Sequence, residues 1–140
     1  GSTGTRRMPD RFFDTNVLLY LLSDDRTKAD IAEGLLRGGG TVSVQVLNEI
    51  ANVTQRKLRM SWSQTDEFLL MIREFVTVEP LTYETHDLGI ALARKHALSV
   101  YDAVIVAAVL LAGCDTLLSE DMQDGFRVAD RITIRNPFAA

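Results

Sequence analysis

The 140-residue sequence has little cysteine or histidine: one cysteine, Cys114, and two histidines, His86 and His96. A single cysteine forms no internal disulfide, so the sequence does not indicate an oxidising compartment. These three side chains also lack the close Cys/His spacing of zinc sites, which argues against zinc. We expect Cys114, beside an apolar run, to be a small buried hydrophobe. We assign neither histidine a role in catalysis.

Long apolar runs are also missing. The longest, residues 103–112, has half of the roughly 20 residues that cross a bilayer, and we expect a buried helix there. Residues 1–7 have no apolar core of the kind that export signals contain, and we interpret them as a cloning remnant ahead of Met8. We therefore expect one domain over residues 8–140 that makes no use of a membrane and acts in the cytoplasm.

Positive charge is in short supply. The 15 Lys and Arg residues against 19 Asp and Glu give a net charge of −4. This balance excludes binding of nucleic acid through overall positive charge, but it leaves room for a metal site built from acidic side chains. With 46% hydrophobic and 24% charged residues, the composition is that of a globular protein.

Short apolar segments alternate with amphipathic ones. We expect strands near residues 11–13, 41–43, 77–79, 115–119 and 131–134. We expect helices over residues 17–22, from a cap at Thr27 to 37, over 44–60, from a capping box at Ser61 to 75, from a cap at Thr82 to about 96, and from 101 to 113. This alternation predicts an α/β domain with a mostly parallel sheet and helices on both faces.

Four acidic residues occupy corresponding places in this pattern. Asp14 and Asp121 follow predicted strands, Asp102 lies in the first turn of the apolar helix, and Glu49 lies about two turns after the second strand. Ligands of parallel sheets bind beyond the carboxyl ends of the strands, so we expect these side chains to converge. Converging carboxylates repel one another unless a cation offsets them. Oxygen ligands without cysteine or histidine favour Mg²⁺ or Mn²⁺.

Each acid also has a purely structural explanation. Asp14 would serve as a helix N-cap, and Asp102 as a favourable negative charge at a helix start. Glu49 would lie on a solvated helix face, and Asp121 in a turn. The apolar neighbours of Asp14 and Asp102 weigh against this reading, because carboxylates in such surroundings usually have a partner or a function.

Four segments of the sequence resemble one known family. They are residues 12–20 (FFDTNVLLY), 43–49 (SVQVLNE), 99–103 (SVYDA) and 117–122 (LLSEDM). Each motif is weak alone, but the four together, in this order and at these distances, resemble the PIN domain, and more narrowly the VapC-like toxins of bacterial toxin-antitoxin systems. The resemblance spans about Arg11 to Ile134 and implies a three-layer α/β/α fold around a short-stranded, mostly parallel sheet.

The resemblance also implies an activity, metal-dependent endoribonuclease cleavage of RNA with one or two divalent ions. The acids that match the family's catalytic and metal-binding quartet are Asp14, Glu49, Asp102 and Asp121. Asn16 and Ser119 match polar positions that orient the carboxylates or the attacking water. Asp124 is a further candidate ligand, with an exposed loop position as the alternative. Metal-bound water would attack the phosphodiester in line.

The expected partners are RNA, a cognate antitoxin protein and a second copy of the chain. Arg56, Lys57 and Arg59 end the helix that bears Glu49 and are candidates for RNA contact, although charge at a helix C-terminus is favourable in itself. Apolar side chains on the helices at residues 27–37 and 61–75 suit an antitoxin or a homodimer.

Other protein classes fit less well. A haloacid-type phosphotransferase needs a second Asp where Asn16 stands, and a response receiver needs a late Lys, although none follows Lys95. The remaining alternative is a PIN-like module that binds RNA or protein without catalysis. The intact set of four acids argues against it.

Overall fold

The structure, a computed structural model, describes residues 10–139. Its strands are β1 (Arg11–Phe13), β2 (Gly40–Ser43), β3 (Val76–Glu79), β4 (Thr116–Leu118), β5 (Arg127–Val128) and β6 (Ile132–Arg135). Its helices are α1 (Thr15–Leu19), the 3₁₀ helix η1 (Tyr20–Leu22), α2 (Arg26–Arg37), α3 (Val44–Arg56), α4 (Trp62–Arg73), α5 (Tyr83–His96) and α6 (Val100–Leu111). The segment interpreted as a cloning remnant, residues 1–7, lies outside the described residues.

The strands form one sheet in the order β3-β2-β1-β4-β6-β5. All neighbours pair in parallel except β5 and β6. Phe12 of β1 lies opposite Thr41 on one side and Leu117 on the other. The chain adds β2 and β3 on one side of β1 and later adds β4 and β6 on the other. The order therefore reverses between β1 and β4, where the connections diverge and leave a crevice at the carboxyl ends.

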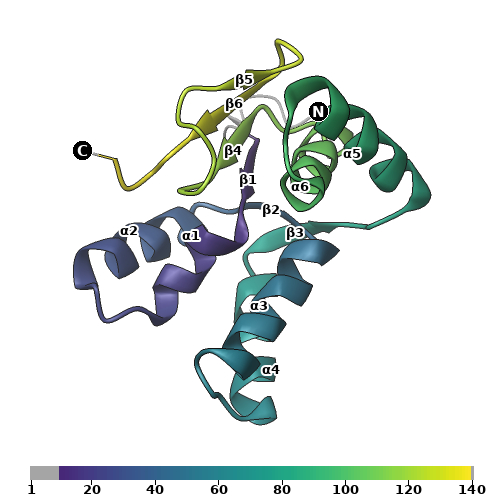
Figure 1. The fold of residues 1–140 in the computed structure, drawn as a ribbon. Coiled ribbons are helices and arrows are strands. Elements are labelled where there is room, and N and C mark those ends of the chain that lie inside the picture. The colour runs from purple at the N-terminus through teal and green to yellow at the C-terminus, as the bar shows by residue number, and fades with distance from the viewer. Residues whose placement is uncertain (1–9, 140) are drawn as a thin grey trace, which may run out of the picture.

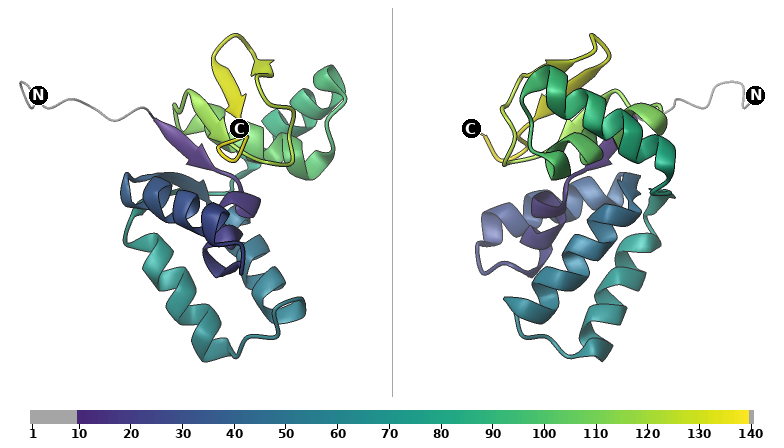
Figure 2. Two further views of the ribbon diagram at one scale, coloured as in Figure 1. Left: turned by 90° about the vertical axis from the view of Figure 1, so that its left-hand side faces the viewer. Right: turned by 45° about the vertical axis from the view of Figure 1, so that its right-hand side comes forward.

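Helices cover both faces of this sheet. In Figure 1, α5 and α6 lie together on one flank, and α1 and α2 lie on the opposite flank. Helices α3 and α4 form a hairpin that projects from the body, as both views of Figure 2 show. The predicted α/β/α architecture is confirmed. Among residues 10–139, no helix combines the length and apolarity of a membrane span.

Burial explains why one helix is apolar all round. Every side chain of α6 from Ala103 to Val109 is buried, between the sheet and α5, so no face of this stretch needs to be polar. Phe12 and Phe13 of β1 are also fully buried, and Cys114 is 5% exposed, as expected of a small core hydrophobe. The strand that leads to Asp14 is therefore embedded in the hydrophobic core.

The helix caps show where sequence patterns succeeded and where they did not. Ser61 and Thr82 cap α4 and α5 as predicted, each with a capping box. The predicted cap at Thr27 is wrong, because the Asp25 side chain accepts the Lys28 N–H and α2 begins at Arg26. Helix α3 ends at Arg56 rather than at residue 60, since Arg59 has the left-handed φ of 54° that breaks a helix.

Two further elements differ in detail from expectation. Helix α1 begins at Thr15, directly after its N-cap Asp14, but the helical segment predicted up to residue 22 ends as the 3₁₀ helix η1. The two-residue strand β5 was not predicted at all. It exists by pairing antiparallel with β6, and a strand of this length has no periodicity of its own.

Candidate metal-binding active site

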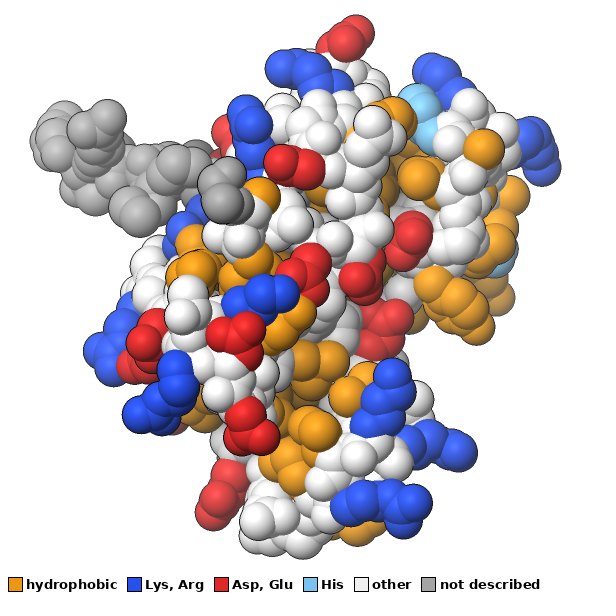
Figure 3. All heavy atoms as spheres, turned by 60° about the vertical axis from the view of Figure 1, so that its left-hand side comes forward, with side chains coloured by type: hydrophobic (Ala, Val, Ile, Leu, Met, Phe, Trp, Pro, Cys, Tyr) orange, Lys and Arg blue, Asp and Glu red, His pale blue; other side chains and the backbone are white. Residues whose placement is uncertain are grey.

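A cavity of about 640 Å³ opens at the carboxyl ends of β1 and β4. The four acids that were predicted to converge all line it: Asp14, Glu49, Asp102 and Asp121. They come from four separate places, namely the end of β1, the second turn of α3, the first turn of α6 and the loop after β4. Figure 3 shows acidic side chains close together in the middle of the face, with basic side chains below them.

Asp14 is the most buried of the four, with 6% of its surface exposed. Its N–H continues the sheet by donating to the Leu118 carbonyl at 2.9 Å. One carboxylate oxygen caps α1 by accepting the Thr15 N–H at 2.8 Å, and the other accepts the Ser119 hydroxyl at 2.8 Å. The N-cap explanation is therefore correct, but it accounts for only one of the two oxygens.

The electrostatic surroundings of Asp14 favour its protonated form. The pKa of Asp14 is raised to about 6, mainly by burial and further by the nearby charges of Glu49 and Asp102, while the hydrogen bonds from Ser119 and Thr15 act in the opposite direction. Loss of hydration is the main cause, and the like charges of the two neighbouring carboxylates add to it. A cation placed in the cavity would reverse that effect.

Two polar side chains connect the ends of β1 and β4. The Asn16 amide nitrogen lies 3.2 Å from Asp14 and 3.1 Å from Asp121, and its oxygen accepts the Glu120 N–H at 2.9 Å. The fully buried Ser119 hydroxyl donates to Asp14 and accepts the Asp121 N–H at 3.2 Å. Both residues thus contact the carboxylates that the resemblance assigned them to orient.

Glu49 has a partner that sequence reasoning missed. The Thr15 hydroxyl donates to its carboxylate at 2.6 Å, and Thr15 is 8% exposed. The signal for this role was available, because a hydroxyl directly after a strand-end aspartate lies in the first turn of the next helix. At the other wall of the cavity, Gln45 donates to the Tyr101 carbonyl at 3.2 Å and so joins the start of α3 to the start of α6, beside Asp102.

Asp124 lies apart from the other acids. Its carboxylate accepts the Asn136 N–H at 2.8 Å, which ties its loop to the end of β6, and it does not line the cavity. Among the predicted RNA contacts, Lys57 lines the cavity, whereas Arg56 and Arg59 are exposed outside it. All three were expected to end the helix, but only Arg56 lies within α3. Lys57 is the C-cap of α3, and Arg59 lies beyond it.

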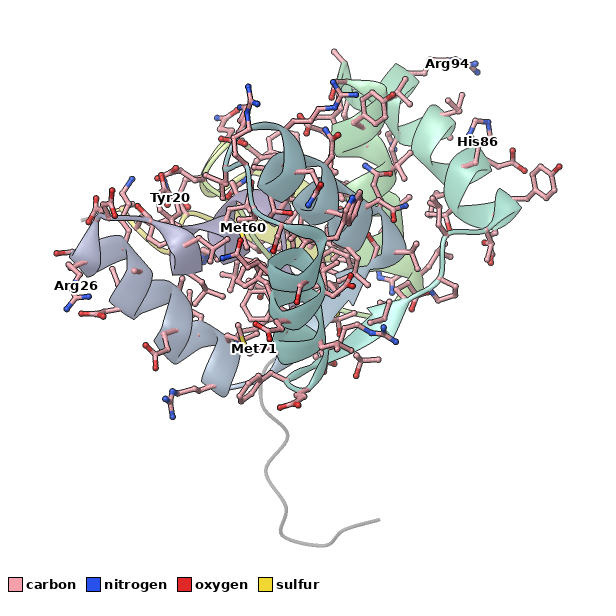
Figure 4. All side chains as sticks on the ribbon, turned by 90° about the horizontal axis from the view of Figure 1, so that it is seen from below. Tyr20, Arg26, Met60, Met71, His86 and Arg94 are labelled. Atoms are coloured by element: carbon pink, nitrogen blue, oxygen red, sulfur yellow. The ribbon has the colours of Figure 1, made fainter. Side chains whose placement is uncertain are left out.

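The histidines lie away from this chemistry. Figure 4 shows His86 on the outer side of α5, and His96 packs edge-on against Phe126. Neither residue lines the cavity.

The cavity has the donor chemistry of a hard divalent cation. Its walls offer carboxylate and amide oxygens, and no sulfur or imidazole is among the described lining residues. Within residues 10–139, no three His, Cys, Asp or Glu side chains meet at a single metal-binding point. The donor set thus fits Mg²⁺ or Mn²⁺, while the distances between the carboxylates define no coordination geometry.

Comparison with solved structures found similar folds. One is a toxin-antitoxin complex from Klebsiella pneumoniae, with a TM-score of 0.70, 18% identity, and coverage of 94% of this chain and 100% of that chain. Another is VapC20 of Mycobacterium tuberculosis, described as a sarcin-ricin loop cleaving toxin, with a TM-score of 0.65, 20% identity, and coverage of 80% and 92%. A third is VapBC2 from Rickettsia felis bound to a DNA fragment from their promoter, with a TM-score of 0.63, 16% identity, and coverage of 90% and 97%.

At these identities the likeness shows a shared fold. The comparison with curated proteins gave no match. The family model of the PIN domain matches residues 11–131, which include all four acids of the cavity. The chain belongs to the PIN domain family.

Proposed function

We propose that this protein is a divalent-metal-dependent endoribonuclease that hydrolyses phosphodiester bonds of RNA. The observation that carries the proposal is the convergence of Asp14, Glu49, Asp102 and Asp121 on one cavity. Collecting like charges around a buried carboxylate destabilises a fold, so an arrangement of this kind points to chemistry. Membership of the PIN domain family and the fold shared with VapC20 support the same activity.

In this proposal one group of residues binds the ion and another holds those ligands in position. The four acids hold the ion, which when bound lowers the pKa of its water and offsets charge that develops on the phosphate. Asn16 and Ser119 hold Asp14 and Asp121 in place, and Thr15 holds Glu49. Asp14 binds the ion in its ionised form, so below about pH 6 proton release accompanies binding.

Lys57 is the proposed first contact of the RNA backbone, because it is the one basic residue among the described residues that line the cavity. The overall charge does not oppose this contact. When the four cavity acids are set aside, the 15 basic residues are matched by 15 acidic ones. The negative charge is therefore concentrated at the site where an ion would neutralise it.

We further propose that the protein acts in the cytoplasm as the toxin of a toxin-antitoxin pair. Fold likeness to a toxin-antitoxin complex and to VapBC2 supports an antitoxin partner. An apolar groove of about 410 Å³ between α2 and α4 suits such a partner, and Figure 4 shows Met71 on the flank of α4 that faces α2. Trp62 and Leu70, 67% and 59% exposed, are available on α4 for a homodimer.

Cleavage of RNA by the purified chain tests the catalytic proposal. We expect cleavage with Mg²⁺ or Mn²⁺ that stops in excess chelator. Asp14→Asn and Asp102→Asn should lower the rate by at least about 100-fold, more than the roughly 10–100-fold loss typical of a group outside the ligand set. The matched control is Asp87→Asn, an exposed acid on α5 outside the cavity.

Circular dichroism and thermal unfolding show whether the variants remain folded. Full activity in excess chelator, or in either cavity variant, contradicts the proposed function. Metal binding without cleavage favours the alternative, a non-catalytic binding module.

A growth assay tests the toxin role. Expression of the wild-type protein should arrest bacterial growth, and expression of Asp14→Asn should not.

A further inference from the structure

A compact charged cluster lies next to the acidic cavity without lining it. Lys28 of α2 donates to one carboxylate oxygen of Glu120 at 2.7 Å and to the Tyr20 hydroxyl at 3.1 Å. The Tyr20 hydroxyl in turn donates to the other carboxylate oxygen of Glu120. We name these three residues the Lys28 clamp. None of them lines the cavity that holds the four acids.

Aromatic rings enclose the clamp. The Lys28 ammonium lies 4.6 Å from the centre of the Tyr20 ring and 5.5 Å from that of Phe138. The two rings also meet edge-on, 4.7 Å apart. The side chains of Lys28 and Glu120 are 32% and 25% exposed, so water screens this ion pair less than an open surface pair. Such a network is held more rigidly than an isolated surface salt bridge.

The clamp is connected to the cavity through the backbone of Glu120. Glu120 stands between Ser119 and Asp121, and its N–H donates to the Asn16 side-chain oxygen at 2.9 Å. That bond decides which way the Asn16 amide faces. Its nitrogen is then turned toward Asp14 at 3.2 Å and Asp121 at 3.1 Å.

The opposite orientation of the amide would be unfavourable. It would place the Asn16 oxygen against two carboxylates and leave the Glu120 N–H without its acceptor. A shift of Glu120 would therefore disturb the Asn16 amide and Asp121 together. The side chain of Glu120 is the part of this loop that is fastened to α2 and η1.

We propose that the Lys28 clamp positions the Asp121 loop and the Asn16 amide for binding of a divalent cation. The inference rests on the proposed function in taking Asp14 and Asp121 as ligands of that cation. Lys28, Tyr20 and Glu120 are positioning residues, which act through Asn16 and the loop backbone. Lys28 also offsets the negative charge of Glu120. Without Lys28, that charge would add to the negative charge of the four acids at the cavity.

Mn²⁺ binding to the full chain, measured by calorimetry without RNA, tests the clamp. Lys28→Met and Glu120→Ala should weaken Mn²⁺ binding by about tenfold, the size of effect seen when groups behind metal ligands are removed. Lys28→Arg keeps a positive charge that can pair with the Glu120 carboxylate and should bind Mn²⁺ within about twofold of wild type. Lys95→Met removes an exposed lysine on α5 and is the matched control.

A second readout needs no metal. The side-chain amide NMR signals of Asn16, assigned by their loss in Asn16→Asp, should shift in Lys28→Met and Glu120→Ala and stay in place in Lys95→Met. Unchanged Asn16 signals overturn the proposal, as does Mn²⁺ binding that is unchanged or tighter in Lys28→Met. Tighter binding would mean that the freed Glu120 charge outweighs positioning.

RNA cleavage, measured separately, distinguishes a failure of the proposed function from a failure of the clamp proposal. A wild-type chain that binds Mn²⁺ but does not cleave RNA contradicts the proposed function, and the clamp is still judged by the Mn²⁺ affinities. A wild-type chain that binds no Mn²⁺ contradicts both proposals.

Discussion

At the scale of single residues, Asp14 combines two roles that are usually considered separately. One oxygen caps a helix, and the other takes part in a network that joins two strand ends. Because the side chain is almost fully buried, its ionisation is unfavourable and its pKa rises to about 6 from its ordinary value of 3.8. The folded state therefore binds a proton between about pH 4 and pH 6 that the unfolded state has released.

This difference predicts how the stability of the metal-free protein depends on pH. Stability contributed by protonated Asp14 is present below about pH 4 and is lost as the pH rises through about 6. The loss is at most about 3 kcal/mol, because each tenfold difference in proton affinity between the folded and unfolded states corresponds to about 1.4 kcal/mol. Urea unfolding in chelator at pH 4.5 and 7.5 measures it, with Asp14→Asn as the variant that lacks this dependence. Parallel pH profiles for wild type and Asp14→Asn would contradict the shift, and Asp87→Asn should follow wild type.

The four acids were predictable from sequence because each follows a recognisable strand end or helix start. The resemblance also indicated Asn16 and Ser119 as their polar partners, but two long-range contacts at or beside the site were not predictable. Thr15 meets Glu49 across 34 residues, and Lys28 meets Glu120 across 92. Contacts of this kind depend on how helices are placed on the sheet, and neither local periodicity nor charge pattern encodes that placement.

At the scale of elements, helix starts were predictable where the capping residue forms a capping box with a residue three positions later. Ser61 with Gln64 and Thr82 with Thr85 are such cases. At the start of α2, Asp25 and Thr27 compete, and the carboxylate of Asp25 takes the N-cap position. The choice between two neighbouring capping residues involves a small free-energy difference, so a sequence pattern does not decide it.

The packing of α5 on α6 gives a prediction with a built-in control. A Cβ at Gly89 would lie 2.8 Å from the Val104 side chain, so Gly89→Ala should destabilise the protein by about 1–3 kcal/mol through overpacking. A Cβ at Gly34 of α2 would meet no other atom within 4 Å. Gly34→Ala should therefore stabilise the folded protein by about 0.5–1 kcal/mol. Urea unfolding of both variants measures the two effects. Stabilisation by Gly89→Ala as well as by Gly34→Ala would show that α5 and α6 are not in this close contact.

At the scale of the whole molecule, the site results from strand order. The alternation of strands and helices predicted a parallel sheet, and the divergence between β1 and β4 brings the end of β1 and the loop after β4 together. The strand order could not be predicted from the residue pattern. Strands of three or four residues have too few alternating positions to determine which strands lie next to each other. The resemblance to the PIN domain implied a short-stranded, mostly parallel sheet between helix layers, and the strand order is seen only in the structure.

Charge distribution over the molecule yields a prediction for RNA binding. If Lys57 contacts a phosphate, Lys57→Ala should reduce the salt dependence of RNA affinity by about 0.7 in log–log slope, the release of one counterion from a single strand. Lys95→Ala, on the exposed face of α5, should leave the slope unchanged. Binding titrations from low to moderate salt measure both slopes. An unaltered slope for Lys57→Ala removes this residue from the RNA interface.

The central claim is that four acids from separate elements form one divalent-cation site. A crystal structure of the protein with Mn²⁺, with anomalous scattering data, tests it most directly. The account predicts an anomalous peak in the cavity, within ligand distance of Asp14 and at least two of Glu49, Asp102 and Asp121. Absence of a peak at saturating Mn²⁺, or a peak only outside this cavity, would contradict it.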